Sequence, residues 1–265
     1  MVTAPSTLSP SKASTFTQCP RRYRYTAIEG LVEPPTPATV TGTIVHAALE
    51  HLFVEHPRGT RGRAQLEATT ATALATAIDE GEVEAAGIAP HQLDALGTKV
   101  RAIGEGYLKL EDPNDPVAVA TELFVDTHLA HTHLRGIVDR LDLRRDGTFA
   151  IVDYKTGRTP GPAYEKKAFE AMRIYAMLLE PLLPAPVSVL RLYYLSSSTI
   201  LEEESSPARN GAVRRRTEAL WDAIEHSCAA DAFPPRPGPL CRFCHFAAHC
   251  PGDPPSTRAG MDPAP

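Results

Sequence analysis

The stretch GIVDRLDLRRDGTFAIVDYKTG, residues 136–157, decides the fold because two segments of strand-forming residues flank an Asp-Gly turn signal at 146–147. This pattern predicts an antiparallel hairpin with Asp139 in its first strand and Asp153 in its second. Side chains alternate along a strand, so Asp153 and Lys155 are expected on the same face. The hairpin can therefore place two carboxylates and an ammonium group in one site.

The length of the loop decides whether the two carboxylates face each other. Asp139 lies directly opposite Asp153 only if Arg144 pairs with Thr148 across a three-residue loop. Loops of this length commonly contain one residue with a left-handed backbone, and Gly147 adopts that conformation at little cost. A two-residue Asp-Gly turn would shift the carboxylates by one residue. We therefore predict the longer loop.

Paired carboxylates at this position predict a divalent metal site. Hard oxygen ligands suit Mg²⁺ or Mn²⁺, which can position a water molecule and polarise a phosphoryl oxygen. Lys155 would then help to orient or deprotonate the attacking water. The alternative is an ordinary hairpin with exposed charges, although two opposed carboxylates repel each other unless a cation lies between them.

Helices and further strands are predicted on both sides of the hairpin. Strand patterns cover Val117–Val125 and Val187–Leu195, and helical spacing is found over Ser9–Phe16, Gly42–Val54, two or more segments within 60–110, about Tyr164–Leu179 and about Asn210–Ala229. This order predicts an α/β fold with a mixed central sheet flanked by helices. The phosphate-binding patterns GxxxxGK[ST] and GxGxxG are missing from the sequence.

Composition and charge bound the possible functions. The chain has 265 residues, of which 43% are hydrophobic, and its formal charge of −5 argues against coating of DNA by bulk electrostatics. No run of about eighteen apolar residues lacks a charge, which predicts a cytoplasmic protein without a membrane segment. We expect one domain over residues 1–250, with a helical insertion at about 57–112, and a disordered Pro-rich tail at 251–265.

Local basic clusters are the candidate contacts to nucleic acid, although each is by itself compatible with a solvated surface. They are Arg21, Arg22 and Arg24 with Tyr23 and Tyr25 interleaved, Lys166 with Lys167, and Arg214 to Arg216. The first cluster is the best candidate, because aromatic rings among guanidinium groups suit stacking on unpaired bases beside phosphate contacts.

Cysteine spacing predicts a second metal site. Three thiols follow a C-x2-C-x5-C pattern near the carboxyl end, and one thiol stands alone far upstream; they are Cys241, Cys244, Cys250 and Cys19. Spacing alone leaves both zinc and iron open, because His245 and His249 offer alternative ligands. Cys228 is left over and is expected to be a small buried residue.

The motifs together resemble the PD-(D/E)XK nucleases, in the branch of the RecB-family exonucleases. GIVDR followed by IVDYKTG is similar to the Asp…Asp-x-Lys core of that family, and SKASTFTQCPRRYRY, GTIVHAALE and TELFVD are similar to its flanking blocks. The resemblance runs from about Ser9 to Pro251, and residues 57–115 carry little of it.

The resemblance implies roles for named residues. Asp139 and Asp153 would be metal ligands, Lys155 the catalytic lysine, and His46 a further ligand, with Glu122 a weaker addition. By itself, His46 on an apolar helix would more often be a core residue than a ligand.

One helix departs from the family pattern. The family carries a Gln four residues before a Tyr in the helix that follows the lysine, which makes Tyr175 a site residue but places Ala171 at the Gln position. The missing amide would weaken the positioning of substrate or lysine, unless a neighbour such as Glu170 compensates.

The resemblance also bears on the cysteines, because RecB-like nucleases of the AddB type place one cysteine before the core and three after it. It implies a [4Fe–4S] cluster, in preference to zinc, held by segments at about 9–25 and 236–250. By closing a long loop, the cluster would act mainly in structure.

The resulting functional prediction is a Mg²⁺- or Mn²⁺-dependent deoxyribonuclease, a single-strand exonuclease of DNA repair or recombination. The sequence shows no helicase motor, so the chain would act alone or serve a separate helicase or repair complex. The main alternative is a nucleic-acid-binding or scaffold protein that keeps the fold and cluster with little catalysis. A third is a small zinc-binding regulator with an incidental acidic hairpin.

Overall fold

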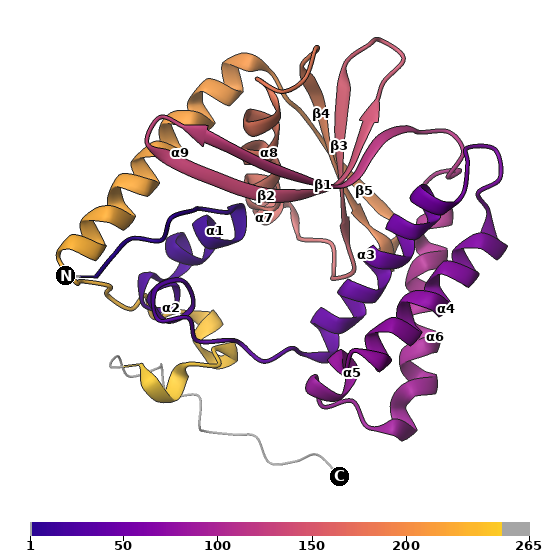
Figure 1. Ribbon diagram of the computed structural model, residues 1–265, viewed down its shortest axis with the longest axis horizontal. Helices are drawn as coiled ribbons and strands as arrows, with labels where there is room; N and C mark the ends of the chain where they lie inside the picture. The colour runs from indigo at the N-terminus through magenta and orange to yellow at the C-terminus, as the bar shows by residue number, and fades with distance from the viewer. Residues whose placement is uncertain (1, 251–265) are drawn as a thin grey trace. The chain divides into compact units, whose positions relative to one another are not determined.

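A five-stranded mixed sheet organises much of the computed structural model, which describes residues 2–250 (Figure 1). Its order is β1-β2-β3-β4-β5, and the strands are Val117–Leu129, Thr132–Leu143, Phe149–Lys155, Val187–Tyr194 and Thr199–Glu204. β3 pairs antiparallel with β2 and parallel with β4, and β4 pairs antiparallel with β5. Flanked by helices, this sheet confirms the predicted α/β class.

The chain divides into two units. Of the described residues, 2–34, 128–134 and 215–250 form the first unit, and 35–127 and 135–214 form the second. The expected tail at 251–265 lies outside the described residues. The predicted boundaries, a nuclease domain over 1–250 with an insertion at 57–112, stay a prediction.

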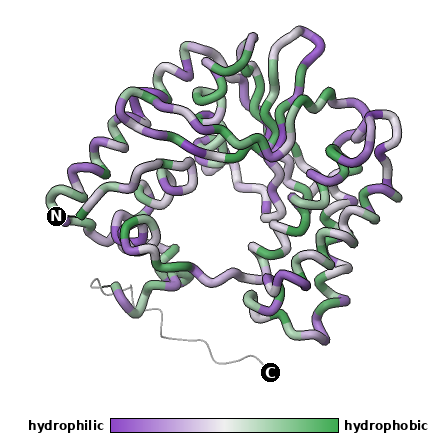
Figure 2. Tube along the Cα trace, in the orientation of Figure 1, coloured by the Kyte–Doolittle hydropathy of each residue, from purple (hydrophilic) through white to green (hydrophobic). Residues whose placement is uncertain are grey.

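The predicted hairpin loop is confirmed. Arg140 pairs with Val152, and the register continues to Leu143 opposite Phe149. The Arg144 N–H donates to the Thr148 carbonyl at 2.8 Å, and Gly147 has a φ of +79°. Figure 2 shows hydrophilic residues at the tip of this loop. The left-handed glycine closes the three-residue loop that aligns the two strands.

Helices of the second unit cover one side of the sheet with a shared core. They are α3 (Pro37–Glu55), α4 (Arg63–Asp79), α5 (Glu82–Ala85) and α6 (Leu93–Leu108), with the short 3₁₀ segment η2 (Pro90–Gln92) before α6. Their buried residues pack with Val152, Tyr154 and Tyr193 of β3 and β4. The helices expected within 60–110 are confirmed.

The helix predicted at about 164–179 is two helices, α7 (Pro162–Ala168) and α8 (Glu170–Leu179). Phe169 at the break is only 4% exposed. Burial of this aromatic side chain accompanies the interruption, and α8 then packs on β3 and β4.

Strand β5 was not predicted. Its side chains alternate between partly buried and exposed, and its second half is a run of glutamates at an edge of the sheet. Glu203 receives a hydrogen bond from Arg173 Nε at 2.6 Å, and Glu202 one from Arg191 Nε at 2.8 Å. These pairs compensate two of the negative charges on β5. The 3₁₀ turn η3 (Leu195–Ser197) joins β5 to β4.

The first unit contains α1 (Pro10–Gln18), α2 (Pro20–Tyr23) and the π-helical η1 (Arg24–Ile28). Its carboxyl-terminal part has two 3₁₀ turns, η4 (Pro239–Phe243) and η5 (Ala247–His249). The long helix α9 (Pro207–Ala229) begins in the second unit and ends in the first. Among residues 2–250, no helix combines the length and apolarity that a membrane crossing requires.

Candidate functional site

The hairpin and two other elements bring two of the three predicted ligands, His46 and Asp139, together with the weaker candidate Glu122 in the second unit. Continuing the β2–β3 register by one residue places Asp139 opposite Asp153. One ligand atom each of His46, Glu122 and Asp139 lie within 4.8 Å of one another. Residues from α3, β1 and β2 thus meet beside the end of β3.

Glu122 reaches this group through an irregularity in β1. Its φ of +43° is left-handed, an unusual conformation for a non-glycine residue in a strand. Before it, Val117 and Val119 are the exposed positions; after it, Phe124 and Asp126 are exposed, so the alternation changes phase. This is the behaviour of a β-bulge, which redirects a side chain at the cost of local strain.

His46 is oriented by a backbone carbonyl. Its Nε2 lies 2.9 Å from the Tyr154 carbonyl oxygen, and its Nδ1 lies 3.4 Å from Asp139 Oδ2. A carbonyl only accepts hydrogen bonds, so Nε2 must carry the proton. In the neutral ring, Nδ1 then directs a lone pair toward a carboxylate, which is the arrangement of a metal-binding histidine.

Asp139 is the most strongly perturbed carboxyl of the group. Burial and then the neighbouring Asp153 raise its pKa to about 7, although His46 and the Tyr154 N–H, which donates to Asp139 Oδ2 at 2.7 Å, oppose the shift. A cation at this position would favour the ionised carboxylate. The residues therefore fit a divalent metal by charge as well as by donor type.

Lys155 lies on the same side of β3 as Asp153, as strand parity predicts. Lys155 Nζ is 2.5 Å from Asp153 Oδ2. Burial lowers the pKa of Lys155, but attraction to Asp153 and their hydrogen bond outweigh it, and the net shift is upward. The ammonium form is thus favoured, which suits orientation of a nucleophile and stabilisation of negative charge.

Tyr175 of α8 approaches the hairpin closely. A Cβ atom on Gly136 would lie 2.4 Å from Tyr175 Cε1, so only glycine leaves room for the ring. Burial and then Asp153 raise the pKa of Tyr175 to about 12, while a hydrogen bond from the Ile137 backbone opposes the shift. The hydroxyl is therefore neutral and available to donate.

The turn of α8 before Tyr175 carries no amide, because Ala171 stands there. Glu170 is exposed at the start of α8, and its electrostatic effect is on Arg173. Compensation by Glu170 stays a prediction.

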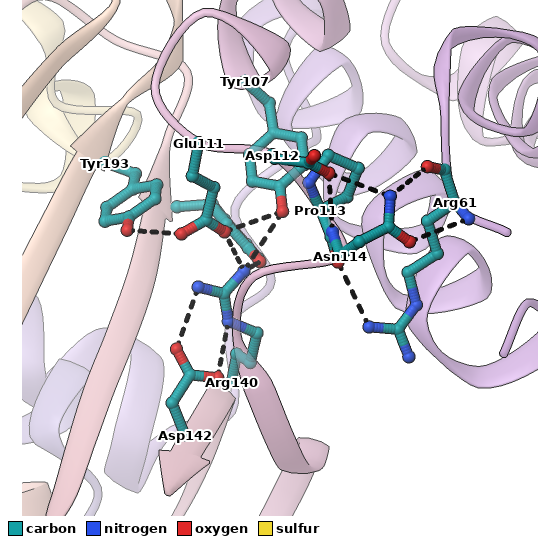
Figure 3. A network of polar contacts seen from close by, with 10 residues as sticks. Arg61, Tyr107, Glu111, Asp112, Pro113, Asn114, Arg140, Asp142 and Tyr193 are labelled. Atoms are coloured by element: carbon teal, nitrogen blue, oxygen red, sulfur yellow. Dashed lines mark hydrogen bonds and ion pairs between the residues drawn. The ribbon is translucent and has the colours of Figure 1, made fainter. Parts of the chain in front are cut away.

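A buried polar network adjoins the carboxylates in sequence, and sequence reasoning missed it (Figure 3). Arg140 is 0% exposed and pairs with Asp142 at 2.9 Å and with Glu111 at 2.6 Å. Its Nη1 also donates to the Tyr154 hydroxyl at 2.8 Å. A signal was present: Arg140 and Asp142 are two apart in an apolar strand, so both must face one covered side.

The four predicted cluster cysteines line one pocket of the first unit. They are Cys19, Cys241, Cys244 and Cys250. Cys228 is elsewhere and only 2% exposed, in keeping with its expected place as a buried residue. The lining residues do not include His245 or His249, the alternative ligands. The Gly238 N–H donates to Cys241 Sγ at 3.3 Å.

The proposed aromatic contacts of the first basic cluster are wrong. Tyr23 is 0% exposed and meets Phe16 edge-on, and Tyr25 is 7% exposed against Phe246. Neither ring is open to a base. Two of the three arginines are also engaged, since Arg22 pairs with Glu33, and Arg24 with Glu29 and Asp231. Burial in a small core outweighs the stacking role that the residue types suggested.

Comparison with solved structures shows a similar fold. A candidate exonuclease from Eubacterium rectale has a similar structure, with a TM-score of 0.58, 13% identity and coverage of 98% of this chain and 91% of that one. A protein named SSO0001 has a TM-score of 0.45 at 16% identity, covering 95% of this chain and 88% of that one. No curated protein sequence matches the chain. The sequence model of the PD-(D/E)XK nuclease superfamily matches residues 7–251, and the chain belongs to that superfamily.

Proposed function

We propose that the protein is a Mg²⁺- or Mn²⁺-dependent deoxyribonuclease that removes nucleotides from single-stranded DNA ends in repair or recombination. The observation that carries this proposal is the meeting of His46, Glu122 and Asp139 ligand atoms within 4.8 Å, beside the Asp153–Lys155 pair. A nitrogen lone pair and two or three carboxylates around one point favour a divalent cation.

The residues divide the work of phosphodiester hydrolysis. Asp139, Asp153 and His46 would hold the metal, and Glu122 would complete the anionic wall. When bound, the metal supplies Lewis acidity toward a phosphoryl oxygen and lowers the pKa of an attacking water. Lys155, held by Asp153, orients that water and balances the charge that develops on the phosphate. The neutral Tyr175 hydroxyl can donate to a phosphate oxygen.

Single-strand exonuclease action is the finer part of the proposal. It is supported by the resemblance to RecB-family exonucleases and by the similar structure of a candidate exonuclease. The formal charge of −5 favours a local substrate contact over binding along a duplex. We place the activity in the cytoplasm, alone or beside a separate helicase or repair complex.

The test is cleavage of end-labelled single- and double-stranded DNA with Mg²⁺, with Mn²⁺ and with EDTA. Release of mononucleotides from single strands, lost in EDTA and in Asp153→Ala, is the expected result. Binding of DNA without metal-dependent cleavage would instead favour the scaffold alternative, for which Ala171 at the usual Gln position is the supporting observation.

We also propose that Cys19, Cys241, Cys244 and Cys250 hold a [4Fe–4S] cluster. The shared pocket supports this ligand set, and the histidines missing from its lining argue against a mixed Cys/His zinc site. Binding of a metal by thiolates depends on pH. Burial raises the pKa of Cys244, and the Phe246 N–H and Arg22 oppose that shift. An anaerobic absorption spectrum with iron and sulfide analysis separates the cluster from zinc.

A further inference from the structure

Two large apolar side chains are exposed on the β1–β2 hairpin beside the candidate ligands. Phe124 is 59% exposed and Ile137 is 47% exposed. Both strands also bury apolar residues, such as Val125 and Val138, so the hairpin has a buried side to which Phe124 and Ile137 do not contribute. Exposed apolar side chains beside a candidate site indicate a surface that binds a ligand.

Contacts on either side locate the pair along the hairpin. β1 and β2 are hydrogen-bonded neighbours joined by a short turn, so they run antiparallel. Arg135 Nε pairs with Asp126 across the two strands at 2.8 Å. Phe124 lies two residues before Asp126 on β1, and Ile137 lies two residues after Arg135 on β2. A further two residues lead to Glu122 and Asp139, whose carboxylates meet. The apolar pair therefore lies one step, about 7 Å, from the ligand group.

We propose that Phe124, supported by Ile137, is a stacking platform for the unpaired base next to the phosphate that is cleaved. This inference rests on the proposed function and names the substrate feature that the site would recognise. A base and its own phosphate are separated by a distance comparable to one such step along a strand. Stacking needs an exposed ring and no particular base, which suits an enzyme that acts on single strands of any sequence.

The platform predicts a substrate-dependent defect. For Phe124→Ala, kcat/KM for a single-stranded oligonucleotide should fall by roughly tenfold, mostly through KM, because loss of one stacking ring costs about that factor. The kcat/KM value for a single-stranded oligonucleotide of abasic nucleotides, which has no ring to stack, should fall much less. Phe124→Trp should restore oligonucleotide cleavage. Val119→Ala is the matched control, since Val119 is 48% exposed on the same strand but lies before the bulge at Glu122.

The outcomes separate the two proposals. If wild-type protein cleaves neither substrate with Mg²⁺ or Mn²⁺, the proposed function fails. If it cleaves both, and Phe124→Ala lowers the two values equally or not at all, only the platform fails.

A second inference comes from the Arg140 network, independently of the exposed pair. Arg140 directly follows Asp139, and Tyr154 lies between Asp153 and Lys155. Arg140 of β2 donates a 2.8 Å hydrogen bond to the Tyr154 hydroxyl of β3. This bond therefore links the residue next to Asp139 with the residue between Asp153 and Lys155. Glu111 accepts a hydrogen bond from the same Nη1 atom, and Asp142 pairs with Nε of the guanidinium group (Figure 3).

We infer that Arg140 and Tyr154 are positioning residues that set the separation of the Asp139 and Asp153 carboxylates. Two substitutions test this positioning role. Tyr154→Phe and Tyr193→Phe each remove one buried hydroxyl of the same network, since Tyr193 donates to Glu111 at 2.7 Å. Only Tyr154 is flanked by the predicted site residues.

The measurement is Mn²⁺ affinity by calorimetry, which needs no cleavage, together with the melting temperature of the metal-free protein. Tyr154→Phe should weaken Mn²⁺ binding by about tenfold, as for other residues that orient ligands, and Tyr193→Phe by less than about twofold. Both should lower the melting temperature by similar amounts. Equal effects of the two variants on Mn²⁺ affinity would overturn the inference and leave the network a structural one.

Discussion

The carboxylate centre of the second unit and the cysteine pocket of the first unit gather metal-binding side chains in different ways. Asp139 and Asp153 belong to one hairpin, and local turn chemistry aligns them. Cys19 lies near the amino end of the chain and Cys241 near the other end, so their meeting closes a loop that contains most of the sequence. The pairing of the two carboxylates follows from short-range geometry, whereas the cysteine site depends on closure of a long loop.

The two sites also differ in how they treat charge. The carboxylate centre concentrates negative groups at a cost, since the pKa of Asp139 rises to about 7. The cysteine pocket is lined by Arg21, Arg22 and Arg236 beside its thiols. Loss of a ligand should therefore cost activity at the first site and stability at the second.

The largest expected effect is on cleavage. Asp153→Ala should lower metal-dependent cleavage by about a thousandfold or more while the melting temperature changes little, because it removes a metal ligand and the partner of Lys155. Glu204→Ala is the control, since it removes an exposed carboxylate from β5, at an edge of the same sheet. Near-wild-type cleavage by Asp153→Ala, in protein free of contaminating nuclease, would refute the assignment.

The next effect concerns the cysteine pocket. Cys19→Ala should lose most iron and the brown absorbance, and its melting temperature should fall, because a crosslink across so long a loop is worth at most about 5 kcal/mol. Activity should fall only indirectly.

Cys228→Ala is the matched variant, because this thiol is buried but does not line the pocket. It should keep its iron. A full cluster in Cys19→Ala with loss in Cys228→Ala would overturn the ligand set, and one zinc without iron in the wild type would overturn the cluster.

His46→Ala should weaken metal binding by about 10- to 100-fold with a small change in stability, since its Nδ1 faces Asp139. His51→Ala, an exposed histidine on the same helix that pairs with Glu55, is the control. A lower melting temperature with unchanged metal affinity in His46→Ala would show that the ring serves the core instead.

The smallest effect is on pH dependence. Because the pKa of Asp139 is about 7 in the folded protein and 3.8 for an ordinary aspartate, the folded state binds more protons in between, and metal-free stability should fall as pH rises from about 4 to 7. Over the upper part of that range Mg²⁺ affinity should rise, because the cation competes with the proton. Asp139→Asn should flatten the stability profile; an unchanged profile would contradict the assigned pKa.

Sequence alone was enough for the parts of the molecule that short-range rules govern. Strand periodicity placed Asp153 and Lys155 on one side of β3. A three-residue loop needs one residue with a left-handed backbone, and Gly147 in that position set the β2–β3 register. These features depend on neighbours a few residues away, whose geometry is the same in any protein.

Only the tertiary structure decided the rest. The bulge that directs Glu122, the close approach of Tyr175 to Gly136 and the burial of Tyr23 all depend on partners far along the chain. The sequence of β5 is rich in glutamate, and Arg140 is a charged residue; only the structure shows the partners with which β5 forms an edge strand and Arg140 is buried. Side-chain type sets what a residue can bind, but burial and packing against distant segments determine which of those partners it meets.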